Sequence, residues 1–143
     1  MHLALACDAM AVRTALQNLR DGLNELHLSQ DDTDRIEIVM AEILNNIVEH
    51  ACSDRPDCNI GIEILRKSSD LQVTVTDNGC AMPGGTLPAG ILTDIQGSRD
   101  SLPEGGFGWF LIRDLTTNVS YSRRDQKNHL SFEFELGRDT VSN

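Results

Sequence analysis

Basic residues are scarce in this sequence, and their scarcity argues against one class of partner. The 143 residues include 12 Lys and Arg against 22 Asp and Glu, which gives a formal net charge of -10 at pH 7. A nucleic-acid-binding surface needs clustered basic side chains, so we expect no nucleic-acid partner. The acidity does not exclude nucleotide binding, because a few backbone amides and a magnesium ion can hold a polyphosphate locally.

Long apolar runs are missing as well. No segment approaches the roughly 20 consecutive apolar residues of a membrane-spanning helix. Residues 1–7 lack the basic start and the length of a signal peptide, and a short first strand fits them better. We therefore expect a single cytoplasmic domain over residues 1–143, without a membrane segment.

The cysteines form no metal-binding pattern. The chain has four, Cys7, Cys52, Cys58 and Cys80, with no Cys-x-x-Cys pair and no histidine spacing suited to zinc. We predict free and mostly buried thiols in a reducing compartment.

The apolar residues first recur at the spacing of a helix and then alternate as they do in a β-strand. Asp8 can cap a helix with apolar residues to Leu23, and residues 31–33 offer the start of a second helix whose apolar stripe runs to Ala51. Alternating residues at 60–64 and 71–75 predict a β-hairpin joined at 68–70. A glycine- and proline-rich lid (about 80–106), a helix (107–115) and a hairpin with a polar turn at 123–128 follow, before a polar tail (137–143). Because strands and helices segregate, the fold class is α+β, one sheet with helices on one face.

Three polar clusters interrupt this pattern. In the first, Glu42, Asn46 and His50 follow one another at intervals of one helical turn, so they project from one edge of the helix. A carboxylate and an amide oxygen one turn apart suit an oxygen-ligated Mg²⁺ and a positioned base. The alternative is an ordinary solvated helix edge.

The second cluster, Asp77-Asn78-Gly79, is first of all a turn after a strand. It would also suit a carboxylate that accepts a hydrogen bond from an adenine amino group, with Gly79 letting the backbone approach the base. In the third cluster, Gly105, Gly106, Phe107 and Gly108 precede an apolar helical run. Glycines at the start of a helix can expose free amides as an anion site, although this loop fits neither a P-loop nor a dinucleotide fingerprint.

Together the clusters resemble the motifs of the GHKL, or Bergerat-fold, ATPase superfamily. Glu42-x-x-x-Asn46 on a helix, Asp77-x-Gly79 after a hairpin, a lid and Gly106-x-Gly108 opening a helix follow its order. Residues 41–51 are similar to the N-box of the anti-sigma-factor serine kinases, and residues 105–115 to their glycine-rich run. The resemblance implies a two-layer sandwich with one mixed or antiparallel sheet, helices on one face, a nucleotide lid, and ATP and Mg²⁺ as cofactors.

The resemblance also assigns roles to single residues. It makes Glu42 the general base, Asn46 the Mg²⁺ ligand and Asp77 the adenine acceptor. The lining of the nucleotide site falls to Gly79 and to residues of the glycine-rich run, Gly105, Gly106, Phe107 and Gly108. His50 belongs either to this site or to the packing and capping of its helix end. One departure is Glu104, where such kinases carry a basic lid residue; Arg99 is the candidate for the missing cation.

The function implied is a protein-serine kinase that uses Mg-ATP to phosphorylate a small anti-anti-sigma (STAS-type) partner. Such a kinase also sequesters a sigma factor or another regulator, and the family commonly forms homodimers. One alternative is a catalytically weak GHKL module that only sequesters its partner, which Glu104 favours. Another is a histidine-kinase catalytic domain acting in trans, which the missing dimerisation helices disfavour.

Overall fold

The computed structural model describes residues 1–53, 57–88 and 106–137. Its elements, in chain order, are β1 (His2–Ala6), α1 (Ala9–Glu25), α2 (Gln30–Asn46), a π-helix η1 (Ile47–Ala51), β2 (Asn59–Lys67), β3 (Asp70–Asp77), a 3-10 turn η2 (Pro83–Gly85), α3 (Gly106–Leu115), β4 (Thr117–Arg124) and β5 (Lys127–Glu135). Among the described residues, no helix is long and apolar enough to cross a membrane.

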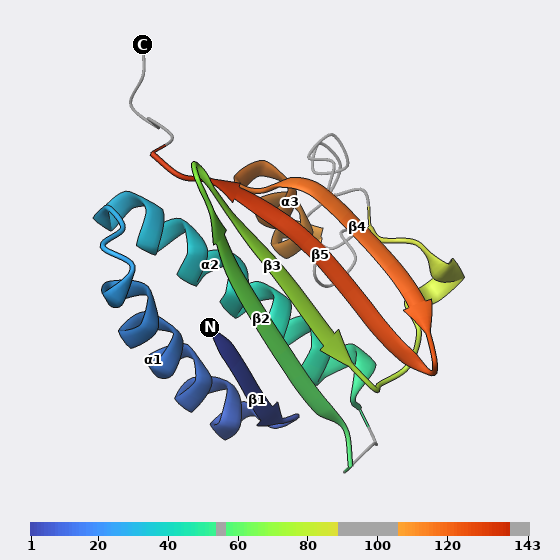
Figure 1. The fold of residues 1–143 in the computed structure, drawn as a ribbon. Helices are drawn as coiled ribbons and strands as arrows, with labels where there is room; N and C mark the ends of the chain where they lie inside the picture. Colours follow the sequence, from blue (N-terminus) through green and yellow to red (C-terminus); the bar gives the residue numbers. More distant parts are fainter. Residues whose placement is uncertain (54–56, 89–105, 138–143) are drawn as a thin grey trace.

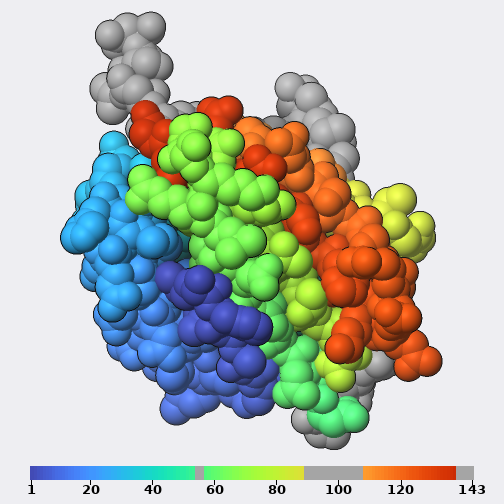
Figure 2. All heavy atoms as spheres, in the orientation of Figure 1, coloured from blue at the N-terminus to red at the C-terminus, as the bar shows by residue number. Residues whose placement is uncertain are grey.

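The five strands form one antiparallel sheet in the order β1-β2-β3-β5-β4. The helices lie together on one face of this sheet, with α2 behind β2 and β3, α1 beside α2 along the β1 edge, and α3 behind β5 (Figure 1). In the same orientation the opposite face of the sheet is turned toward the viewer, from β1 in dark blue to β4 in orange (Figure 2). The α+β prediction, with one sheet and helices on one face, is confirmed.

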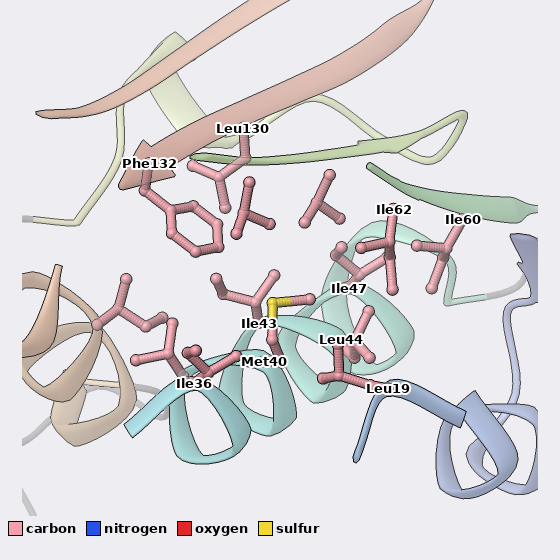
Figure 3. Close-up of a cluster of buried hydrophobic side chains, with 14 of the residues drawn as sticks. Leu19, Ile36, Met40, Ile43, Leu44, Ile47, Ile60, Ile62, Leu130 and Phe132 are labelled. Atoms are coloured by element: carbon pink, nitrogen blue, oxygen red, sulfur yellow. The ribbon is translucent and has the colours of Figure 1, made fainter. Parts of the chain in front are cut away.

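The core lies between the sheet and α2, as the two periods in the sequence require. Every second residue of β3, Leu71, Val73 and Val75, is at most 1% exposed, because side chains alternate across a strand. Figure 3 shows apolar side chains of α2 and η1 facing those of β2 and β5; the labelled ones include Met40, Ile43, Leu44, Ile47, Ile60, Ile62, Leu130 and Phe132. Burial of these side chains supplies most of the driving force for folding.

The same alternation places two polar residues in the buried rows. Asp77 continues the β3 row and Asn128 continues the β5 row, and the two are cross-strand partners in the register. Each is 5% exposed. A buried polar group is costly unless it is hydrogen-bonded, so these two residues mark the polar end of an otherwise apolar layer.

Several local predictions need correction. Asp8 does cap α1, accepting a 2.7 Å hydrogen bond from the amide of Ala11. The second helix, however, begins at Gln30 rather than at 31–33, because the hydroxyl of Ser29 accepts from the amide of Asp32. The polar turn predicted at 123–128 is mostly strand. Its true turn is Asp125-Gln126, both at positive φ, the geometry that suits a tight hairpin.

The prediction of four free thiols is wrong for two of them. Cys52 and Cys58 form a disulfide, with their Cα atoms 5.7 Å apart. Cys7 and Cys80 are free, Cys7 half-buried and Cys80 exposed. Sequence spacing does not reveal this pair, because cysteines six positions apart can bond only where the fold sets them at the Cα separation that a disulfide needs.

Candidate functional site

The first and third predicted clusters meet where α3 begins beside α2. A Cβ atom at Gly108 would lie 2.6 Å from Glu42 Oε2 and 3.9 Å from Asn46 Nδ2. Gly108 therefore has no room for a side chain unless Glu42 moves. This close approach sets the Glu42 carboxylate and the Asn46 amide beside the first turn of α3, where backbone N–H groups have no partner within the helix.

The Asn46 side chain is half-buried, and one end of its amide lacks a partner. Its Nδ2 atom is buried and donates no hydrogen bond to any described residue. Leaving a buried polar atom unsatisfied typically costs about 1–3 kcal/mol. An amide in this state is the kind of group that a ligand would satisfy.

Asp77 lies at the far end of β3 and is already held on one side. Its Oδ1 atom accepts from the amide of Gly79 at 2.9 Å and from Nδ2 of Asn128 at 2.9 Å. Both hydrogen bonds end on the same carboxylate oxygen. The orientation of this buried carboxylate is therefore fixed by its own turn and by β5.

Asn128 is the centre of a network that sequence reasoning did not find. Its Nδ2 also donates to the carbonyl of Cys80 at 2.8 Å, and its Oδ1 accepts from the hydroxyl of Tyr121 and from Arg123 Nη1. Arg123 donates further to the carbonyl of Gly79 at 2.7 Å. The signal available in the sequence was the period of two in β5, which puts Asn128 in the buried row.

Tyr121 extends this network to the segment that follows Asp77. Its hydroxyl accepts from the amide of Met82 at 3.0 Å. Tyr121 and Arg123 belong to β4, an edge strand that includes the first residues of the polar turn predicted at 123–128. The two side chains tie β4 to residues 79–82, so the whole turn after β3 is held from the neighbouring strands.

Gly79 is in contact with the end of the π-helix. A Cβ atom at this position would lie 2.4 Å from the carbonyl oxygen of Ala51, and the next amide, that of Cys80, donates to the same oxygen at 2.7 Å. The described structure therefore requires glycine here for packing against η1. Its predicted role in admitting the adenine base stays a prediction.

His50 lies in the π-helical turn that follows Asn46. The α-helical register ends at Asn46, and Ile47–Ala51 form one wider π-helical turn that carries His50. The His50 side chain is 51% exposed, with Nε2 3.9 Å from a carboxylate oxygen of Glu49. The prediction that His50 belongs either to the nucleotide site or to the packing and capping of its helix end stays a prediction.

The remaining predicted residues are only partly described. Gly106 and Phe107 form the start of α3. Arg99, Glu104 and Gly105 lie outside the described residues, as does most of the predicted lid, so their roles stay predictions.

Comparison with known proteins places this arrangement in a family. Residues 5–134 match the histidine kinase-like ATPase domain. The serine-protein kinase RsbW of Halalkalibacterium halodurans is 31% identical over 122 residues, which cover 84% of this chain and 73% of that protein. The serine/threonine-protein kinase BtrW of Bordetella bronchiseptica is 33% identical over 91 residues, which cover 63% of this chain and 61% of that protein.

Solved structures agree on the fold. The crystal structure of the RsbU and RsbW domains of a Mycobacterium tuberculosis protein superposes with a TM-score of 0.66 at 17% identity, covering 97% of this chain and 33% of that one. A histidine kinase domain from Erythrobacter litoralis gives a TM-score of 0.54 at 17% identity, covering 87% of this chain and 61% of that one. At such low identity these likenesses concern the fold alone.

Proposed function

We propose that this chain transfers the γ-phosphoryl group of ATP to a serine of a partner protein. The chain belongs to the histidine kinase-like ATPase family, and serine-protein kinases of the RsbW type are among its relatives. The observation that carries the proposal is the meeting of Glu42, Asn46 and Gly108 at the start of α3. It joins a candidate base, a candidate metal ligand and a candidate anion site in one place.

Adenine recognition is assigned to Asp77. Because Gly79 and Asn128 both donate to Oδ1, the second carboxylate oxygen is the proposed acceptor for the exocyclic amino group of the base. A charged acceptor held rigidly in a buried position discriminates strongly, because a ligand that cannot donate leaves it unpaired.

Phosphate binding is assigned to the N-terminus of α3. The first amides of this helix have no helical acceptors, and the helix dipole adds positive potential there. Gly108 allows Glu42 to stand close by, so a serine hydroxyl brought to this point would meet a carboxylate able to take its proton.

A magnesium ion fits the residues present. Carboxylate and amide oxygens are its preferred protein ligands, and the partly buried Asn46 amide has an end without a partner among the described residues. Rotation of the amide about its last bond exchanges the two ends, so either can face the ligand. When bound, the ion would neutralise phosphate charge as the phosphoryl group is transferred.

The regulatory setting is proposed from the same relatives. We infer that the phosphorylated partner is a small anti-anti-sigma (STAS-type) protein and that the chain sequesters a sigma factor or another regulator. Phosphorylation would then release the partner by adding charge at the interface. The second candidate, a nucleotide-gated module that only sequesters, is favoured by Glu104, the residue at the sequence position where such kinases carry a basic lid residue.

One assay separates the two candidates. The purified chain is incubated with Mg-ATP and each small STAS-type protein of the same organism, and phosphoserine is measured by mass spectrometry. Transfer to one such protein supports the kinase. Nucleotide binding with no transfer to any bound partner would favour the sequestering module instead.

A further inference from the structure

Three sulfur atoms come together beside the proposed adenine site. Cys7 follows β1, Cys52 follows η1 and Cys58 precedes β2, and their sulfur atoms all lie within 4.8 Å of one another. Cys52 and Cys58 are bonded, and Cys7 is a free thiol. The proposed phosphoryl transfer uses none of the three.

The disulfide joins two segments that both hold the turn after β3. Ala51, the neighbour of Cys52, accepts a 2.7 Å hydrogen bond from the amide of Cys80. Asn59, the neighbour of Cys58, donates from its amide to Oδ1 of Asn78 at 2.7 Å. Each bonded cysteine is therefore one residue away from a contact with the turn that carries Asp77.

Cys7 links the same cluster to Asp77 itself. Its amide donates to the carbonyl of Cys58 at 3.1 Å. Burial, followed by the negative charges of Asp77 and Asp8, raises the pKa of the Cys7 thiol to about 11. Because only a thiolate attacks a disulfide readily, Cys7 near neutral pH leaves the Cys52–Cys58 bond in place.

We propose that Cys52 and Cys58 are a reversible modification site for low-molecular-weight disulfides, and that closing their disulfide strengthens nucleotide binding at Asp77. The second half rests on the proposed nucleotide site. The first half stands on the sulfur cluster alone.

The oxidation step balances without any other reactant. The thiolate of one cysteine attacks a sulfur of the small disulfide, forming a mixed disulfide and releasing one small thiol. The second cysteine thiolate then attacks the protein sulfur of the mixed disulfide and releases the other small thiol. The protein pair loses two electrons, which reduce the small disulfide, and two protons pass through the solvent to the released thiols.

The disulfide is coupled to nucleotide binding because it orders the turn that carries Asp77 before the nucleotide binds. The disulfide fixes the separation of Ala51 and Asn59, whose contacts with Cys80 and Asn78 position the turn. In the reduced state the two segments are held by weaker contacts, and binding must then order the turn at a cost in entropy. The oxidised protein is therefore the tighter binder.

The test compares the full chain equilibrated with reduced or with oxidised glutathione. Free thiols are alkylated in denaturant and mapped by peptide mass spectrometry, and the affinity for a fluorescent ADP analogue with Mg²⁺ is measured in parallel. We expect alkylation of Cys52 and Cys58 after reduction, and after oxidation a peptide in which these two cysteines are bonded to each other and neither is alkylated. The oxidised chain should bind the analogue about five-fold more tightly, or better.

Two variants sharpen the comparison. The double variant Cys52→Ser/Cys58→Ser, which has neither partner of the disulfide, should bind the analogue equally in both buffers, at the affinity of the reduced wild type. Cys80→Ser removes the exposed free cysteine outside the cluster and should keep the full response to oxidation.

Each half can fail separately. If Cys52 and Cys58 stay alkylatable in oxidised glutathione, the modification site is overturned, and so it is if all three sulfurs hold a thiophilic metal that blocks the disulfide. If the disulfide forms and affinity does not change, the coupling is overturned and the nucleotide site stands. If neither state binds the analogue, the nucleotide site fails, while the mapping still decides the first half.

Discussion

The two ends of the proposed nucleotide site differ in how far they are completed by the chain itself. At the adenine end, Asp77 is buried and oriented by Gly79 and Asn128, and Asn128 in turn by Tyr121 and Arg123. At the phosphate end, Asn46 carries a buried donor that no described residue satisfies. The sheet therefore preorganises the adenine end, whereas the phosphate end, between α2 and α3, keeps a polar group that a bound ligand would satisfy.

The largest expected effect lies at the phosphate end. Glu42→Gln keeps the size of the side chain and removes the base, so phosphoryl transfer should fall about 10²–10⁴-fold. Nucleotide affinity should change little, because the adenine end is untouched. Quenched-flow transfer rates and calorimetric affinities measured on the same sample check this, and transfer at the wild-type rate would exclude Glu42 as the base.

A smaller loss is expected from Gly108→Ala. The new methyl group would meet Glu42 Oε2, the mobile tip of a side chain. The free energy of unfolding should therefore fall by no more than about 1 kcal/mol relative to the wild type. The displaced carboxylate should nevertheless slow transfer by tenfold or more, as roughly 1 Å misplacements do. Gly85→Ala, where nothing lies within 4 Å, is the control for replacing glycine, although its positive φ adds strain. Normal transfer by Gly108→Ala would contradict the proposed role of this contact.

At the adenine end we expect an intermediate effect from Asn128→Ala. The change leaves Asp77 Oδ1 with one donor fewer in a buried position, which typically costs about 1–3 kcal/mol, or roughly 5- to 150-fold in nucleotide affinity if that cost falls on binding. Ser131→Ala, on the opposite face of the same strand, is the matched control. Equal affinities of the two variants in calorimetry would show that the network does not prepare Asp77.

The smallest effect concerns Cys7. Because its raised pKa of about 11 delays the appearance of the thiolate, its alkylation rate in the oxidised protein should keep rising well beyond pH 9. Asp8→Asn, which can still cap α1, should shift the profile toward lower pH by removing one of the negative charges that raise it. A rate that levels off near pH 9 in both proteins would argue against this environment.

The sequence predicted much of the fold because its signals were local. The cap at Asp8 and the alternation in β2 and β3 depend on neighbours along the chain, and both are confirmed. The turn at 123–128 was misplaced because Arg123 and Asn128 are polar for a reason that lies across the sheet, in their bonds to Gly79 and Asp77.

The sequence predicted the main residues of the candidate site but not all of its local structure. Glu42, Asn46 and Gly108 could be named from motif order, and the structure brings them together. The π-helical turn that carries His50 could not be foreseen, because it leaves no periodic mark in five residues. The disulfide was equally hidden, because it depends on how close the end of η1 lies to the start of β2 in the folded chain.

The central claim is that this fold binds an adenine nucleotide through Asp77, and calorimetry of Asp77→Asn with Mg-ADP tests it most directly. The amide oxygen can keep both hydrogen bonds now made to Oδ1, while an NH₂ group replaces the acceptor proposed to face the base. We predict an unchanged thermal midpoint and an affinity weakened by about 1.5–3 kcal/mol, roughly 10- to 150-fold. Wild-type affinity in the folded variant would contradict the account.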